Sequence, residues 1–174
     1  MKTVMLFASQ ISQGELMPSK LQDEIKQAKP FESAQEELWL NLSRTTAMAS
    51  HVVEQGLRQH GLSATQYNVL RILRGAGVQG LCQYEIGDRL VAQVPDVPRI
   101  VDRMEKAGWV LRQRGASDRR IVMASLTPAG LNLVNSLDEP VVQMIGGIFA
   151  GLEEAQVAIL NELLVAARSA GSRE

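Results

Sequence analysis

The chain holds 174 residues, of which 45% are apolar and 21% charged, so it can bury the core of one domain and is not disordered as a whole. One cysteine and two histidines exclude a disulfide framework, a multi-cysteine zinc site and a three-histidine metal centre, and aromatic residues at only 4% disfavour recognition of RNA by stacking. No apolar run approaches the roughly 18 residues of a membrane span, so we expect a cytoplasmic protein without membrane contact, metal or cofactor.

Residues 1–31 are predicted to be an N-terminal extension. Within it, residues 20–28 can form two helical turns, and Pro30 stops them because proline cannot continue a helix. Residues 32–60 follow as a predicted dimerisation helix. The apolar side chains of this helix recur every three or four positions in two adjacent stripes, and stripes of that width must pack against more than one neighbour.

A DNA-binding domain is predicted for residues 61–127, and its first helix has a well-marked start. Ser63 and Gln66 form an S-x-x-Q capping box, and the helix is expected to run to about Arg74. The loop at residues 75–80 spells G-x-G-x-x-G. We disfavour a nucleotide site there, because a helix precedes the loop where a dinucleotide-binding fold has a strand.

A tight turn joins the next two predicted helices, at residues 82–91 and 96–107. Asp96 is the expected N-cap of the second helix. This cap places Pro98 at the second helical position, where its absent N–H does not interrupt the hydrogen-bond ladder. The alternative start has Pro95 at the first helical position, which would put Pro98 at the fourth and remove one backbone hydrogen bond.

Two strands, at residues 109–114 and 121–126, are predicted to form a β-hairpin. Residues 128–174 are then predicted to supply C-terminal dimerisation helices, the first kinked at Pro140 and the last at residues 153–170. The predicted fold class is mainly α with a small β-hairpin (α+β). Its architecture is a winged helix-turn-helix flanked by helices that form a dimerisation domain.

The net charge of −1 conceals a basic stretch in the middle of the chain. Residues 99–120 hold seven basic and three acidic side chains. Arg99, Arg103 and Lys106 share the helix face opposite the apolar one, and arginine on such a face can bond guanine in the major groove. The candidate DNA contacts on this recognition helix are Asp96, Val97, Pro98, Arg99, Arg103 and Lys106.

The hairpin is the second basic element. Asp118 lies two residues from Arg120 and can hold its guanidinium in one rotamer, and a rigid arginine on a narrow β-ribbon suits the minor groove. Either element alone is also consistent with an ordinary solvated charged surface, but both flank the same turn. The candidate DNA contacts on the wing are Arg112, Arg114, Ser117, Asp118, Arg119 and Arg120.

Residues 118–130, which read D-R-R-I-V-M-A-S-L-T-P-A-G, resemble the wing signature D-R-R-x-x-x-x-x-L-T-x-x-G of the MarR family of transcriptional regulators. Residues 99–110 are similar to the end of that family's recognition helix, and the resemblance covers roughly residues 32–170. It implies a homodimer that binds palindromic operators in double-stranded DNA, with Asp118 and Arg120 as the wing pair. Many members of the family release DNA when they sense a small aromatic acid or an oxidant.

The helix at residues 82–91 departs from the family pattern. Cys82 stands where the family has threonine, and cysteine caps a helix poorly even with Glu85 three residues on. Gly87 stands where the family has alanine and costs the helix about 1 kcal/mol. Redox-sensing members place their thiol near the first helix, so we disfavour a redox role for Cys82.

These observations favour a dimeric, sequence-specific DNA-binding transcriptional regulator, acting as a repressor that a small aromatic effector releases. The alternative is a winged-helix dimer that acts as a protein-interaction module without DNA binding; arginines on both helix and wing favour the first hypothesis. We do not expect an enzyme, since no Ser–His–acid, H-E-x-x-H or P-loop pattern occurs. The operator and the effector-binding residues stay open at this stage.

Overall fold

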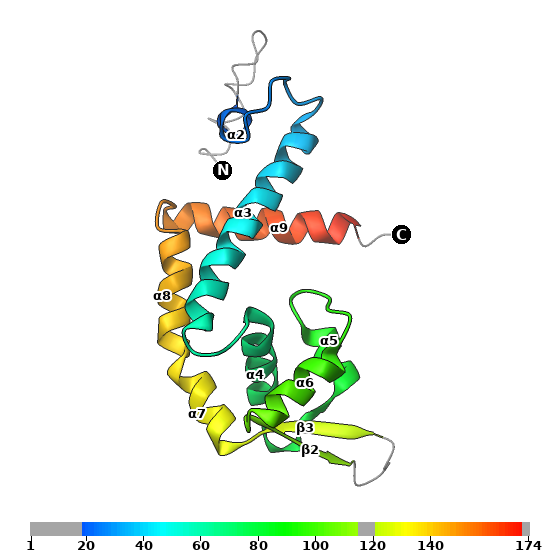
Figure 1. Cartoon of the computed structure of the whole chain (residues 1–174). Coiled ribbons are helices and arrows are strands. Elements are labelled where there is room, and N and C mark those ends of the chain that lie inside the picture. Colours follow the sequence, from blue (N-terminus) through cyan, green and yellow to red (C-terminus); the bar gives the residue numbers. More distant parts are fainter. Residues whose placement is uncertain (1–18, 115–120, 172–174) are drawn as a thin grey trace. The chain divides into compact units, whose positions relative to one another are not determined.

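The structure is a computed structural model that describes residues 19–114 and 121–171 (Figure 1). The chain divides into two compact units, Met1–Ala47 and Met48–Glu174. The long helix α3 (Ala34–Arg58) begins in the first unit and continues into the second. The prediction of a long helix within residues 32–60 is thereby confirmed, while its role in dimerisation stays a prediction.

The first unit contains the short helix α2 (Lys20–Glu24). Its N-cap is Ser19, whose side-chain oxygen accepts a hydrogen bond from the backbone N–H of Gln22 at 3.2 Å. The prediction of a helix in this region is confirmed, but Pro30 is not what ends it. The chain already leaves the helix before Lys26, which has a left-handed φ of 54°.

The second unit contains a winged helix-turn-helix, so the predicted fold class is confirmed (Figure 1). Its elements in chain order are α4 (Ala64–Ala76), η1 (Gly77–Gln79), β1 (Leu81–Cys82), α5 (Gln83–Arg89), α6 (Val97–Lys106), β2 (Val110–Arg114) and β3 (Val122–Leu126). The sheet has the antiparallel order β1-β3-β2, with Leu81 opposite Ala124. The sequence predicted only the β2–β3 hairpin, because a two-residue strand is too short to show a period.

The caps of α4 and α6 form as predicted. The N–H of Gln66 donates to the Ser63 hydroxyl at 3.1 Å, and the N–H of Ser63 donates to the Gln66 side chain at 2.9 Å, which completes the capping box. Asp96 caps α6, with its carboxylate 3.0 Å from the N–H of Arg99, and Pro98 occupies the second helical position. After α6 the chain reverses at Gly108, whose φ is 78°.

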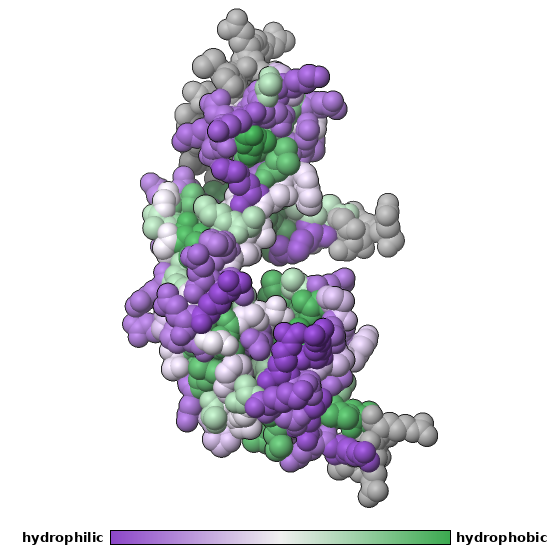
Figure 2. Space-filling model, viewed as in Figure 1, coloured by the Kyte–Doolittle hydropathy of each residue, from purple (hydrophilic) through white to green (hydrophobic). Residues whose placement is uncertain are grey.

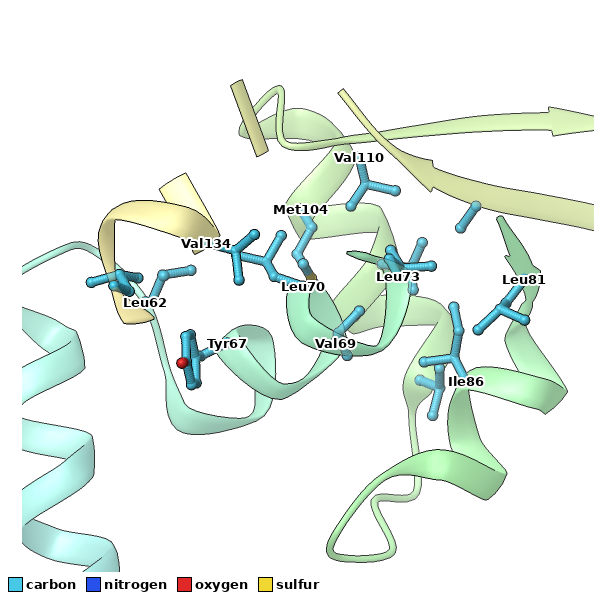
Figure 3. Close-up of a cluster of buried hydrophobic side chains, with 14 of the residues drawn as sticks. Leu62, Tyr67, Val69, Leu70, Leu73, Leu81, Ile86, Met104, Val110 and Val134 are labelled. Carbon is cyan, nitrogen blue, oxygen red and sulfur yellow. The ribbon is translucent and has the colours of Figure 1, made fainter. Parts of the chain in front are cut away.

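One core joins the winged elements to the helix that follows them (Figure 3). Leu70 and Leu73 of α4 lie at its centre and are fully buried. Val101 and Met104 of α6 close it from the other side, also without exposure. The buried members are Leu57, Leu62, Tyr67, Val69, Leu70, Leu73, Leu81, Ile86, Val97, Val101, Met104, Val110, Ala124, Val134, Leu137 and Val141.

The chain continues in three helices, α7 (Pro128–Ser136), α8 (Asp138–Ile148) and α9 (Glu154–Gly171). The sequence predicted one helix kinked at Pro140, and this is wrong: the helix breaks at Leu137, three residues earlier. The proline ring would meet the carbonyl of the residue four positions back, which is Ser136, so the ladder fails one turn before the proline. Pro140 itself then lies in the first turn of α8.

The two last helices leave much apolar surface uncovered. Among the described side chains of α9, Leu164 alone is half-buried and the rest are exposed. The exposed large apolar residues of this region are Val142, Ile145, Phe149, Leu152, Val157, Ile159, Leu160, Leu163 and Val165. None of the described helices is both long and apolar enough to cross a membrane.

Candidate nucleic-acid interface

Helix α6 presents two faces of opposite character. Val97, Val101 and Met104 lie in the core, so the side chain of Val97, which the sequence placed among the candidate DNA contacts, is not available at the surface. Asp96 and Pro98, at the start of the helix, are exposed. Figure 2 shows strongly hydrophilic residues over the part of α6 that faces the viewer.

Three basic residues extend from the outer face of α6, but they are not equivalent. Arg99 and Arg103 are exposed, and neither forms an ion pair with any residue that the structure describes. Lys106 is tied by its ammonium nitrogen to a carboxylate oxygen of Asp102 at 2.8 Å, one helical turn back. Arg99 and Arg103 are therefore the side chains of this face that remain available to an anionic partner.

Arg112 on β2 points toward α6 and is held by two carboxylates of that helix. Its Nε donates to Glu105 at 2.6 Å and its Nη2 donates to Asp102 at 2.9 Å, while a second contact joins Nη2 to Glu105. Its backbone N–H also donates to Glu105, at 3.2 Å. Arg112 was predicted from the sequence as a wing contact to DNA, and the structure instead places it in an internal ion-pair network.

The network shifts the titration of its members. Hydrogen bonding to Lys106, assisted by Arg112, holds the pKa of Asp102 below its ordinary value. Hydrogen bonding to Arg112 lowers the pKa of Glu105 in the same way, and Glu105 in turn raises the pKa of Arg112. The carboxylates of Asp102 and Glu105 are therefore ionised at neutral pH, and the cations beside them offset their negative charge.

The rest of the wing is described only in part. Arg114, at the end of β2, is exposed and forms no ion pair within the described part of the chain. The predicted contacts Ser117, Asp118, Arg119 and Arg120 lie outside the described residues. Of the predicted wing contacts that the structure describes, Arg114 is therefore the one whose side chain is exposed and available to DNA.

Thr127 joins the base of the wing to helix α7. Its hydroxyl donates to the carbonyl of Gly108 at 2.7 Å and accepts from the N–H of Gly130 at 3.1 Å, and its own N–H donates to the carbonyl of Trp109 at 3.0 Å. The bond to Gly108 was not predicted from the sequence. That bond depends on where α6 ends in space, which no local pattern encodes.

Helix α5, which supports α6, keeps part of its cap despite Cys82. The N–H of Cys82 donates to the carboxylate of Glu85 at 2.8 Å, and this backbone hydrogen bond lowers the pKa of Glu85. A Cβ added at Gly87 would lie 3.6 Å from a methyl carbon of Val97, an ordinary contact. Close packing therefore does not demand glycine at this position.

A hollow of about 330 Å³ lies between the end of α4, β3 and the start of α7. Its lining is mostly apolar and consists of Leu73, Arg74, Gly77, Val78, Leu126, Thr127, Pro128 and Leu131. The guanidinium of Arg74 already contacts Asp138, through hydrogen bonds of 2.8 and 2.9 Å, and Asn135 at 2.9 Å. Within the described ranges, no group of three or more His, Cys, Asp or Glu side chains is placed to hold a metal ion.

A basic helix packed against a β-hairpin in this topology defines a winged helix-turn-helix protein, and comparisons with known proteins agree. The family model of the MarR family matches residues 62–122. The uncharacterized HTH-type transcriptional regulator YkoM of Bacillus subtilis is 30% identical over 145 residues, which cover 81% of this chain and 91% of the relative.

Solved structures give the same result. A MarR transcription factor from Planctomyces limnophilus is 37% identical, with a TM-score of 0.62 over 79% of this chain and 99% of the other. A mutant of MarR from E. coli, solved in complex with operator DNA, has a TM-score of 0.69 at 23% identity and covers 86% of this chain and 99% of its own. The chain belongs to the MarR family, whose members among its relatives are helix-turn-helix transcriptional regulators.

Proposed function

We propose that the protein is a homodimeric, sequence-specific repressor that binds a palindromic operator in double-stranded DNA. The observation that carries the proposal is a pair of exposed arginines on α6 that no acidic side chain of the described ranges engages. Arg99 and Arg103 lie one turn apart on a helix whose opposite face is buried. A helix of this kind fits the major groove, where arginine bonds the O6 and N7 atoms of guanine in a bidentate manner.

The remaining candidate contacts take supporting roles in this proposal. Asp96 and Pro98 lie at the N-terminal end of α6, the end that approaches the bases in helix-turn-helix proteins. The wing, from Arg114 through Ser117, Asp118, Arg119 and Arg120, approaches the adjacent minor groove. Residues 61–127 then form the DNA-binding domain, with residues 1–31 as an extension.

We assign dimerisation to the segments at residues 32–60 and 128–174. The support for the second segment is the exposed apolar surface of α8 and α9, which is larger than isolated surface residues explain. Two-fold symmetry places two copies of α6 about one helical turn of DNA apart, roughly 10 base pairs, and so requires a palindromic site.

A small aromatic acid is the effector class that we propose. The mostly apolar hollow between α4, β3 and α7 has a volume in the range of small-molecule sites and adjoins the base of the wing. A ligand releases DNA only if it binds the DNA-free conformation more tightly than the DNA-bound one. Calorimetry with a panel of such acids, paired with DNA-release measurements, tests this part of the proposal.

The DNA-binding proposal is tested by selecting bound duplexes from a random pool and titrating them against the protein. Replacing Arg99 or Arg103 with alanine should cost about 1–3 kcal/mol on the best site and relax base preference at one symmetric pair of positions. Lys106→Ala is the matched control on the same face, and its smaller effect follows from the existing bond to Asp102. If the wild-type chain selects no duplex, the interaction-module hypothesis takes the place of this one.

A further inference from the structure

We propose that Arg112 is a positioning residue that fixes the wing to the recognition helix and does not itself contact DNA. The inference rests on the proposed DNA-binding function and concerns how the two DNA-contacting elements keep their relative position. It separates Arg112 from the other basic residues of the helix and wing.

The strand geometry decides which way Arg112 points. Alternate residues of a strand face the same side of the sheet, so Arg112 shares a face with Val110. Val110 is buried, and Ala124, which pairs with Arg112 across the hairpin, is also buried. Leu111, on the other face, is 45% exposed. Arg112 therefore extends along the covered side of the sheet toward α6, and its side chain is only 27% exposed.

The contacts of Arg112 satisfy most of its donors. Its Nε donates to Glu105, its Nη2 donates to Asp102 and also forms an ion pair with Glu105, and its backbone N–H donates to Glu105 as well. A guanidinium held by two carboxylates of a neighbouring element is fixed in orientation, because its planar fork matches the carboxylate geometry. A DNA phosphate would have to compete with both carboxylates for the same group.

Two acidic side chains lie on the helix that is proposed to enter the DNA groove, which is unfavourable unless they serve another purpose. Asp102 and Glu105 lie on the helix that approaches DNA, where a negative charge opposes binding to phosphates. Arg112 and Lys106 cancel those charges within the protein. What the arrangement adds is a rigid connection between α6 and β2, so that the helix and the wing reach their two grooves at a fixed spacing.

Two mild substitutions distinguish positioning from direct contact. Arg112→Lys keeps the charge but cannot bridge both carboxylates, so operator affinity should fall about tenfold with an unchanged salt dependence. A direct phosphate contact would tolerate lysine. As a contrast, Arg114→Ala should weaken binding and also reduce the salt slope by about one, the share of a single neutralised phosphate.

For Glu105→Gln, positioning and simple charge predict opposite changes in operator affinity. Removing a negative charge from a DNA-binding surface should tighten binding if charge alone matters. If Glu105 anchors Arg112, the same change should weaken operator binding about threefold or more, since a charge-assisted bond is removed. Asp88→Asn on α5 is the matched control for charge: Asp88 is exposed and has no ion pair in the described part of the chain, so its replacement should leave affinity equal or slightly higher.

Titrations on the wild-type operator at several salt concentrations, with melting curves of each variant, complete the experiment. The proposal is supported if Arg112→Lys and Glu105→Gln weaken binding at nearly unchanged melting temperature. It is overturned if Glu105→Gln tightens binding, if Arg112→Lys matches the wild type, or if affinity and melting temperature fall only together. Failure of the wild-type chain to bind any duplex would instead count against the proposed function.

Discussion

The winged segment and the C-terminal helices differ in how each covers its apolar residues. The winged segment, from Ser63 to Leu126, turns most of its large apolar side chains toward one core shared with α7 and the start of α8, although Val78, Tyr84 and Val91 are exposed. Helices α8 and α9 instead leave Val142, Leu163 and their apolar neighbours largely exposed. One region is therefore stabilised within the protomer, whereas the other leaves apolar surface that the second copy covers in the dimer we propose.

The largest effect should come from the core of the winged segment. Leu70→Ala removes a fully buried side chain and should lower the free energy of unfolding by about 2–5 kcal/mol. Chemical denaturation at fixed protomer concentration measures it. A decrease below about 1 kcal/mol would mean that this core is less tightly packed than its burial indicates.

The matched change in the C-terminal region should act on assembly. Leu163 is 62% exposed in the protomer. If it lies in the dimer interface, Leu163→Glu should raise the dimer dissociation constant at least about tenfold, because roughly 1.5 kcal/mol or more of apolar burial is removed. Sedimentation should show the change from about 38 kDa, twice 19.1 kDa, toward a single protomer. Glu162→Gln on the same helix is the control, and equal behaviour of the two variants would remove Leu163 from the interface.

A glycine at the junction of the two regions should give a smaller effect. A Cβ at Gly130 would overlap the carbonyl oxygen of Trp109, so the backbone of α7 or of Trp109, just before β2, has to move. We expect Gly130→Ala to cost about 1–3 kcal/mol of stability. Gly75→Ala in α4 is the counterpart: nothing lies within 4 Å of the added carbon, and the change should stabilise the protein by about 0.5–1 kcal/mol. Thermal melting of both variants tests whether the close approach is real.

The smallest effect should come from the ion pair between Arg74 and Asp138. The hydrogen bond from Arg74 lowers the pKa of Asp138, so the pair contributes fully above the ordinary carboxyl pKa of about 3.9 and is lost as pH falls through the lowered value. Asp138→Asn should lower the melting temperature at pH 7 by at most about 3 °C, because both side chains of the pair are partly exposed to solvent. The difference between variant and wild type should shrink below pH 4, and a constant difference would assign the effect to something other than this titration.

The predictions that rested on local sequence signals were the most reliable. The capping box of Ser63 and Gln66 and the Asp96 cap each depend on residues within one turn of the chain, and the structure has both of them. The break at Leu137 shows the limit of such reasoning. A proline predicts that a helix is interrupted. Its ring, however, clashes with the carbonyl four residues earlier, so the helix breaks one turn before the proline.

The candidate site was predictable in its elements and not in its contacts. The spacing of Arg99 and Arg103 predicted a shared outer face from the helical period alone. In the sequence, Arg112 could not be distinguished from these two residues. Whether an arginine forms an ion pair does not follow from its charge or from the residues next to it in the chain. Its assignment to Asp102 and Glu105 depends on the hairpin returning alongside α6.

The sequence by itself determined the order of the helices and strands except for β1 and the division between α7 and α8, together with the caps of α4 and α6, the basic character of helix and wing, and the family to which the chain belongs. These follow from periodicity, backbone preferences and a spaced motif, all of which act over a few residues. Only the tertiary structure decided that β1 joins the sheet, that Val97 is buried, and that acidic side chains bind Arg112 and Lys106 but, within the described ranges, neither Arg99 nor Arg103. The physical reason is that ion pairs and burial depend on distances between segments remote along the chain, which packing alone fixes.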